Sequence, residues 1–285
     1  MLLGRQQKLK MGGAPPLSVT GTMLTHPGCV RQFNEDVVAY VLPTGRDSII
    51  GRGAFALVAD GMSGHAAGEV ASWIAADAVR RLYYRLDGPP PRVLAKCLAA
   101  ANRAIYQHSQ SDASCAGMGT TCTVLALRDN TAYLSHIGDS RAYLLRDDKL
   151  RQISEDHSLV AQLVRDGAMT QEEAARSPQR NIILRALGTE PTARPLIWRK
   201  GLPLRAGDVF VLCSDGLSDL VDDATIAATV TRLAPFEACQ ALIDATLAAG
   251  GTDNVSVGVL VVGQGCSSPE CSRTTRPLAA GGGQP

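Results

Sequence analysis

The sequence is poor in aromatic residues and has no marked excess of charge of either sign. Aromatic residues make up 4% of the 285 residues, and the formal net charge is +1 at pH 7. The core of this chain must therefore be built mainly from Ala, Val, Leu and Ile. A near-zero net charge gives no basic field for nucleic acid, so we expect no nucleic-acid partner.

Long apolar runs and paired cysteine motifs are also absent from the sequence. The opening segment, MLLGRQQKLKMGG, is too often interrupted by charge to be a signal peptide, and no apolar run has the length of a membrane span. None of the eight cysteines forms a C-x-x-C pair, and no histidine is spaced as a zinc ligand with them. We therefore predict a cytoplasmic protein with buried free thiols and no membrane contact, and the spacing of cysteines and histidines gives no support for a zinc site.

Composition divides the chain into three parts. Residues 1–16 form a flexible leader with Gly and Pro, residues 17–263 form one domain, and residues 264–285 form a small, polar tail that we expect to be disordered. The domain has no internal repeat and no long linker. The hydrophobic share of 45% is sufficient for one sizeable core.

Short apolar runs rich in β-branched residues predict the strands of this domain. The predicted strands are Leu17–Leu24, Asp36–Leu42, Ala54–Ala59, Thr120–Leu127, Thr131–His136, Ala142–Leu145, Asp208–Cys213 and Asn254–Val262.

Helical spacing of apolar residues marks two segments between the third and fourth strands. These are Ala66–Leu86, with Trp73 on its predicted apolar face, and Arg92–His108, and the prolines at 89–91 separate them. A further helix is predicted over Pro235–Ala249. Strands occur in runs and helices in pairs, without βαβ alternation, which predicts an α+β fold of antiparallel sheets with helices packed outside.

Acidic residues recur where the predicted strands begin or end. One aspartate follows AFALVA, another follows VFVLCS and a third follows LSHIG. Glu35 and Asp36 open the strand DVVAYVL, and a further aspartate directly precedes NVSVGVLVV. These residues are Glu35, Asp36, Asp60, Asp139, Asp215 and Asp253. Because strand ends can share one rim of a pair of sheets, we expect these carboxylates to lie close together.

Carboxylates gathered in this way need a compensating positive charge, since each raises the pKa of the others. Mg²⁺ or Mn²⁺ suits a shell of carboxylate, carbonyl and water oxygens. The glycine after Asp60, Gly61, lets a backbone carbonyl approach such an ion. The alternative is that each Asp-Gly is an ordinary turn, which is the usual explanation for a single site but weakens with repetition at several strands.

Six motifs then appear in the order found in one enzyme family: RQFNED (31–36), VADGMSGHAAGE (59–69), GMGTT (117–121), HIGDSR (136–141), CSDGL (213–217) and GGTDNVSV (250–257). Over roughly residues 17–263 the chain resembles the type-2C, or PPM, metal-dependent protein phosphatases. The segments 155–170 and 180–188 resemble stretches of bacterial members.

The resemblance implies a four-layer α-β-β-α sandwich, in which two antiparallel sheets are flanked by helix pairs. It also implies a centre with two Mn²⁺ or Mg²⁺ ions. Asp60 would bridge them, the Gly61 carbonyl would bind the first, and Asp215 and Asp253 would complete the second.

Further roles follow from the same resemblance. Glu35 and Asp36 would act mostly through metal-bound water, and Asp139 would help Asp215 to hold a weaker third ion. Arg31 corresponds to the phosphate-binding arginine, and its guanidinium fork suits phosphate oxygens.

The proton donor is less well defined. Many eukaryotic members have a histidine directly after the Asp-Gly, whereas this chain has Met62 there. His65 is a candidate donor or a structural residue, and His157 is interpreted as structural. The segment 157–180 corresponds to the variable flap beside the active site.

The implied activity is hydrolysis of phosphoserine and phosphothreonine in proteins by a metal-activated water, by a monomer that opposes a Ser/Thr kinase. Two alternatives remain open: a silent member that binds phosphoproteins, and a metallohydrolase of small phosphate esters or cyclic nucleotides. Silent members usually lack a metal aspartate. Asp60, Asp215 and Asp253 are all present, which favours the active enzyme.

Overall fold

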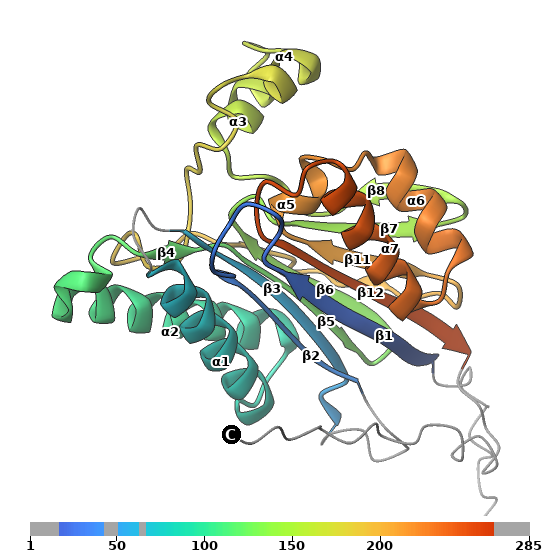
Figure 1. Ribbon diagram of the computed structural model, residues 1–285. Coiled ribbons are helices and arrows are strands. Elements are labelled where there is room, and N and C mark those ends of the chain that lie inside the picture. The colour runs from blue at the N-terminus through green and yellow to red at the C-terminus, as the bar shows by residue number, and fades with distance from the viewer. Residues whose placement is uncertain (1–16, 43–50, 63–66, 265–285) are drawn as a thin grey trace, which may run out of the picture.

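The computed structural model describes residues 17–42, 51–62 and 67–264 of the chain. Within these ranges two antiparallel sheets pack face to face, and helices cover both outer faces (Figure 1). The last strand reaches Gln264. The predicted leader and the rest of the predicted tail lie outside the described residues.

The first sheet has five strands in the order β1-β12-β11-β7-β8, and every neighbouring pair is antiparallel. Its strands are β1 (Leu17–His26), β12 (Val255–Gln264), β11 (Val209–Cys213), β7 (Arg141–Arg146) and β8 (Lys149–Gln152).

The second sheet follows the order β10-β6-β5-β3-β2, with β4 paired to β3 and β9 paired to β6. Its strands are β2 (Asp36–Val41), β3 (Ala54–Met62), β4 (Gly119–Thr120), β5 (Cys122–Arg128), β6 (Thr131–Ile137), β9 (Leu196–Ile197) and β10 (Leu202–Pro203).

The central strand β3 shows how the layers form, because it is buried on both faces. Ala56 and Val58 belong to the apolar layer between the two sheets. Phe55 and Leu57, at the alternate positions, belong to the layer under the first helix pair. Strand side chains alternate between faces, so one run of apolar residues can fill two layers.

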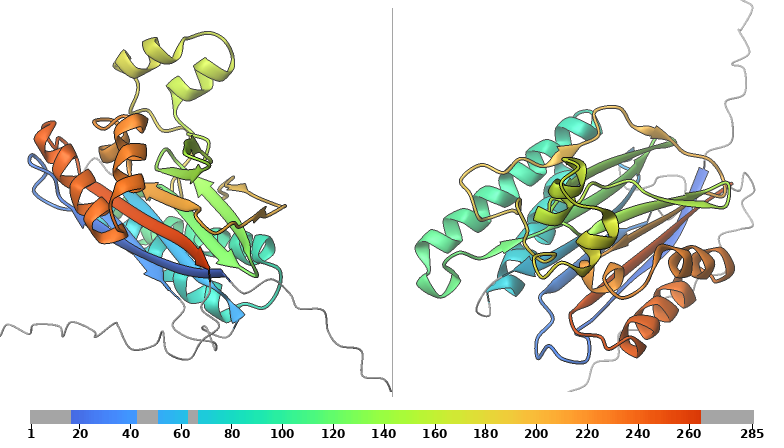
Figure 2. Two further views of the ribbon diagram at one scale, coloured as in Figure 1. Left: turned by 90° about the vertical axis from the view of Figure 1, so that its right-hand side faces the viewer. Right: turned by 90° about the horizontal axis from the view of Figure 1, so that it is seen from above.

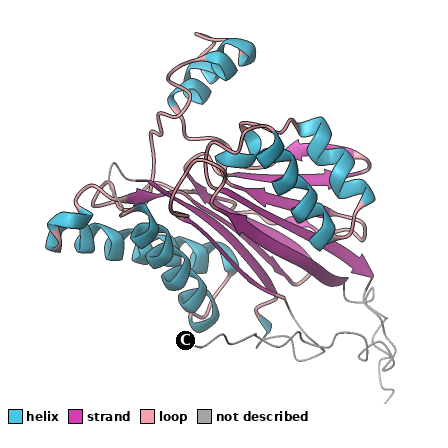
Figure 3. Cartoon of the chain, in the orientation of Figure 1, coloured by secondary structure: helices cyan, strands magenta, loops and turns pink. Residues whose placement is uncertain are grey.

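The helices form a pair on each outer face, as the two views of Figure 2 and the cyan helices of Figure 3 show. The pair α1 (Gly68–Arg85) and α2 (Pro90–Ser111) covers the second sheet. The pair α6 (Asp223–Arg232) and α7 (Pro235–Ala248) covers the first sheet. The predicted four-layer α-β-β-α sandwich is confirmed.

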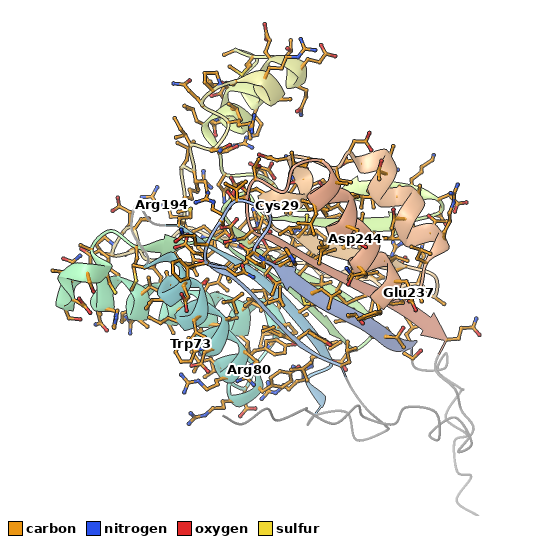
Figure 4. All side chains as sticks on the ribbon, in the orientation of Figure 1. Cys29, Trp73, Arg80, Arg194, Glu237 and Asp244 are labelled. Carbon is orange, nitrogen blue, oxygen red and sulfur yellow. The ribbon has the colours of Figure 1, made fainter. Side chains whose placement is uncertain are left out.

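One residue of the predicted apolar face of α1 does not pack against the core. Ala71, Ala75 and Val79 are fully buried, whereas Trp73 is 60% exposed. Figure 4 labels Trp73 and Arg80 on the outer side of this helix. The small alanines let the helix approach the sheet closely, and a Trp side chain does not fit on that face. The placement of Trp73 on the buried face was therefore wrong.

The predicted strand Thr120–Leu127 is interrupted at Thr121, which separates β4 from β5. The hydroxyl Oγ1 of Thr121 accepts a hydrogen bond from the backbone N–H of Asp60 at 2.9 Å. Its own N–H donates to the Asp60 carbonyl, also at 2.9 Å. The interruption therefore fixes the backbone at the end of β3, where the first aspartate lies.

Two short helices, α3 (Leu159–Arg165) and α4 (Gln171–Arg176), project from the sandwich within the predicted flap segment (Figure 1). A capping box begins α4, in which Thr170 and Glu173 each satisfy a backbone N–H of the other residue. In the described part of the chain, every helix is too short or too polar to cross a lipid bilayer.

Candidate metal centre

Two of the predicted aspartates face each other across neighbouring strands. Asp36 begins β2 and is the register partner of Asp60 on β3. The backbone N–H of Gly61 donates to the Glu35 carbonyl at 3.1 Å. A Cβ atom at position 61 would clash with the Gly68 carbonyl oxygen and would lie 2.7 Å from that of Glu35, so the close approach of these backbone segments requires glycine.

Asp215 comes from the other sheet, and Asp139 lies where the chain passes from one sheet to the other. Asp215 follows β11 and begins the short helix α5 (Asp215–Ser218), while Asp139 lies in the turn between β6 and β7. Ser214 joins the two sheets, because its hydroxyl donates to Asp36 Oδ2 at 2.7 Å. One hydroxyl group therefore connects the carboxylate of one sheet to the strand end of the other.

The pKa values of these carboxyl groups show that they share one buried site. Burial raises the pKa of Asp60 well above its usual range, and Asp36, Asp215 and Asp139 raise it further. Burial also raises the pKa of Asp36 to about 7 and that of Asp215 to about 6. Each group therefore needs a proton or a cation nearby to balance its charge.

Asp139 gives a second indication of a cation. Its side chain is buried, and Oδ1 has no hydrogen-bond partner among the described residues. Burial raises its pKa well above the usual range, with a further contribution from Asp215. A set of buried carboxylate oxygens, one of them unpaired, fits Mn²⁺ or Mg²⁺, because both ions prefer oxygen ligands.

Arg31 lies beside this group on the loop between β1 and β2, the loop on which Figure 4 labels Cys29. Its Nη2 atom lies 2.7 Å from Asp253 Oδ2, and the two side chains are 52% and 38% exposed. Asp253 raises the pKa of Arg31, and Glu35 and Asp215 contribute in the same direction. A guanidinium group accessible to solvent therefore lies at the rim of the carboxylate cluster.

Asn254 was missed by the sequence analysis, although it directly follows a predicted ligand. Its Oδ1 accepts from the backbone N–H of Glu35 at 2.8 Å. Its Nδ2 donates to the carbonyls of Pro27 and Phe33, at 2.9 Å each. Asn254 therefore holds both ends of the loop that carries Arg31. The sequence did contain a signal for this role, because Asn254 directly follows the predicted ligand Asp253, and an asparagine side chain readily hydrogen-bonds nearby backbone groups.

Two histidines, His136 and His157, lie close to Asp139. His65, the candidate for either a proton donor or a structural residue, lies outside the described residues. His157 and His136 are buried and their rings stack with centroids 5.0 Å apart. The backbone N–H of Gly138, next to Asp139, donates to His157 Nδ1 at 3.2 Å. Burial lowers the pKa of His157 to about 3, which agrees with a neutral structural residue.

A cleft of about 570 Å³ lies between the flap and the carboxylate cluster. Asp139, Asp215 and Asp219 line it on the side of the sandwich. Arg180, at the end of the predicted flap segment, lies 3.3 Å from Asp219 and connects the flap to the sandwich. Neither Arg180 nor Asp219 was singled out from the sequence.

Known proteins share this arrangement of elements. The family model of protein phosphatase 2C matches residues 32–249. Serine/threonine protein phosphatase PstP of Mycobacterium tuberculosis is 42% identical over 235 residues, which are 81% of this chain and 43% of PstP. The chain thus spans less than half the length of that relative. Protein phosphatase PhpP of Streptococcus pneumoniae is 37% identical over 245 residues, 84% of this chain and 96% of PhpP.

A solved structure extends the likeness to three dimensions. The catalytic domain of PstP in complex with two manganese ions superposes with a TM-score of 0.75 and 37% identity, and the match covers 87% of this chain and 100% of that one. Sequence, fold and the order of the acidic motifs agree with one another. The chain belongs to the protein phosphatase 2C family, as its motifs predict.

Proposed function

We propose that this chain is a protein phosphatase that hydrolyses phosphoserine and phosphothreonine with two Mn²⁺ or Mg²⁺ ions. The observation that carries the proposal is the convergence of Asp36, Asp60, Asp139 and Asp215 beside the exposed guanidinium of Arg31. The names of PstP and PhpP as protein phosphatases support the same activity.

The residues that would hold the two ions are Asp60, the Gly61 carbonyl, Asp215 and Asp253, with Glu35 and Asp36 acting through water. Asp139 and Asp215 would hold a third, weaker ion. Bound divalent ions supply Lewis acidity, which lowers the pKa of water and stabilises negative charge on phosphate oxygens.

The chain's own residues position the substrate. Arg31 is placed to pair with phosphate oxygens once it exchanges Asp253 for the substrate, and the guanidinium fork gives that contact its geometry. Cys213 lies two residues before Asp215, but burial raises its pKa to about 12. It is therefore a neutral thiol near pH 7 and a poor nucleophile. The proposed hydrolysis uses water, so it requires no protein nucleophile.

Phosphoproteins are the proposed substrates, and a Ser/Thr kinase with overlapping targets is the proposed counterpart. We place the protein in the cytoplasm as a monomer. The six cysteines of the described residues are all free thiols, and five of them are buried, as suits a reducing compartment. Size-exclusion chromatography with light scattering tests the monomer, and a dimer at working concentration contradicts it.

The function is tested with matched phosphopeptides that differ only in phosphoserine, phosphothreonine or phosphotyrosine. We expect Mn²⁺-dependent release of phosphate from the first two, loss of release after chelation, and loss in Asp60→Asn. Failure of the Mn²⁺-loaded protein to release phosphate from any peptide contradicts the enzyme. A preference for phosphotyrosine contradicts the substrate class.

A further inference from the structure

A second group of metal-ligating side chains lies at the far end of α2, where the helix passes into the short 3₁₀ helix η2 (Ala113–Cys115). His108, Asp112 and Cys115 each offer one ligand atom, and these atoms all lie within 4.8 Å of one another. None of the three belongs to the carboxylate cluster or to the motifs that identify the family.

The backbone explains why these three side chains meet. His108 lies in the last turn of α2, Asp112 directly follows the helix, and Cys115 ends η2. The N–H of Asp112 donates to the His108 carbonyl at 3.0 Å, and the N–H of Cys115 donates to the Asp112 carbonyl at 3.0 Å. The helix ends at Ser111 and the backbone of Asp112 is extended, so these two hydrogen bonds turn the chain back towards the last turn of α2.

One carboxylate oxygen of Asp112 is available to a cation. Asp112 Oδ1 accepts from the backbone N–H and the hydroxyl of Ser114, at 2.9 and 2.6 Å. Both bonds fall on Oδ1, which leaves Oδ2 for a cation. These bonds lower the pKa of Asp112, so the group is a carboxylate. Cys115 is a free thiol, 6% exposed, at the edge of the core, while His108 and Asp112 are exposed.

The donor set distinguishes this group from the candidate metal centre. Imidazole nitrogen, carboxylate oxygen and thiolate sulfur together favour Zn²⁺, whereas Mn²⁺ and Mg²⁺ favour oxygen alone. Zinc bonds of about 2.0–2.3 Å need the ligand atoms to be somewhat closer together than 4.8 Å, which rotation of the exposed side chains supplies. We propose that His108, Asp112 and Cys115 bind one Zn²⁺ ion, with water as the fourth ligand, and that the Cys115 thiol releases its proton to solvent on binding.

This site would hold the end of α2 against the strand that supports Asp60. The N–H of Met118 donates to the Cys115 carbonyl at 3.1 Å. Two residues further, Thr120 Oγ1 donates to the Asp60 carbonyl at 2.8 Å. Zinc at this position is therefore expected to stabilise the fold next to the candidate metal centre without supplying a catalytic group.

The test uses the full chain with saturating Mn²⁺, so that the carboxylate cluster is occupied, and titrates Zn²⁺ against a chromophoric chelator. Co²⁺ is added in parallel as a spectroscopic substitute, because a thiolate ligand produces a charge-transfer absorption that oxygen ligands do not. We expect one Zn²⁺ per chain and a thiolate band. His108→Asn is expected to weaken Zn²⁺ binding by about 100-fold, since even residues that only orient a ligand contribute about 10–100-fold.

Two variants separate this site from other thiols. Cys115→Ser is expected to abolish the band, and Cys29→Ser, which removes the exposed thiol near Arg31, is expected to retain it. His108 is exposed, so His108→Asn decides the question even if Cys115→Ser does not fold. A thiolate band that persists in Cys115→Ser, unchanged Zn²⁺ affinity in His108→Asn, or no band in the unmodified chain overturns the proposal.

Discussion

The Nη2 atom of Arg31 lies 2.7 Å from Oδ2 of Asp253, so the predicted phosphate ligand and a predicted metal ligand bind each other. Each partner has another role in the proposed reaction. A cation near Asp253 competes with Arg31 for the carboxylate, and a phosphate competes with Asp253 for the guanidinium. We infer that metal binding and substrate binding both release this pair, and that the pair holds the loop in place before they bind.

Arg31→Ala is expected to lower kcat/KM for a phosphopeptide by about 10–150-fold, the loss of one charge-assisted hydrogen bond of about 1.5–3 kcal/mol. Most of the loss should appear in KM, because the guanidinium contacts phosphate oxygens already in the bound substrate. Steady-state kinetics with saturating Mn²⁺ measure it.

Arg31→Lys refines the result, because it keeps the charge but removes the planar fork. We expect it to recover only part of the activity. Arg80→Ala, on the outer side of α1 (Figure 4), is the control and should leave both constants unchanged. Equal kcat/KM in Arg31→Ala and the unmodified chain contradicts the phosphate role.

Ser214→Ala tests the connection between the two sheets. The Ser214 hydroxyl donates to Asp36 Oδ2 at 2.7 Å and accepts from the backbone N–H of Ser256 at 2.9 Å. Its loss leaves the buried N–H of Ser256 without this partner and removes one hydrogen bond from the buried Asp36 carboxyl, which costs about 1–3 kcal/mol of the free energy of unfolding. Urea denaturation with chelator measures this.

The control for that measurement is Ser18→Ala. Its hydroxyl makes an exposed 3.3 Å bond to the Gln264 carbonyl, so its loss should change the free energy of unfolding by less than about 0.5 kcal/mol. If Ser214→Ala is no more destabilised than Ser18→Ala, the hydroxyl does not join the sheets.

The clustering of the acidic residues was predictable because it depends on strand ends, and apolar strands are visible in sequence. Asp60 and Asp215 each follow an uninterrupted apolar run, and both lie at the same end of the sandwich. The register that sets Asp36 opposite Asp60 was not predictable, since it depends on which strands pair.

The supporting residues were harder to predict for a physical reason. Ser214 contacts Asp36 and Asn254 contacts Glu35 across more than a hundred positions of the chain, and such hydrogen bonds leave no periodic pattern in sequence. Trp73 was misplaced because an apolar stripe does not say which of its residues are small enough to face a sheet. The capping box at Thr170 was present in the sequence and would have predicted the start of α4.

Asp36→Asn tests the pH dependence of the carboxylate cluster. The pKa of Asp36 is raised by burial from 3.8 to about 7, so between these values the folded chain holds a proton that the unfolded chain has lost. The free energy of unfolding therefore falls as pH rises through this window. Asparagine resembles the protonated acid and cannot lose that proton.

We expect the unmodified chain to lose stability relative to Asp36→Asn, on the order of 2–4 kcal/mol, as the pH rises from about 4 to about 7 in chelator. Both proteins contain the same buried histidines, so the difference reports on Asp36 together with Asp60, whose pKa Asp36 raises. Denaturation at several pH values measures it, with Asp244→Asn on the outer face of α7 as control. A difference independent of pH would mean that Asp36 is ionised throughout.

Asp139→Asn addresses the weaker third ion. Asp139 Oδ1 is buried without a partner among the described residues, and an amide of the same shape cannot supply the negative charge that attracts a cation there. We expect the Mn²⁺ concentration for half-maximal activity to rise by about 10–100-fold, as for other residues that support a metal site. Phosphatase activity titrated with Mn²⁺ at fixed phosphopeptide measures this.

Asp156→Asn is the matched control, because Asp156 lines the same cleft but its charge is balanced by Arg141 at 2.8 Å. Losing that pair should lower the free energy of unfolding by about 1–3 kcal/mol and leave the Mn²⁺ dependence in place. The two variants therefore separate a carboxylate that binds a cation from one that only holds an arginine. If Asp139→Asn shifts stability but not the Mn²⁺ requirement, Asp139 belongs with Asp156 as a structural residue, and the centre binds two ions only.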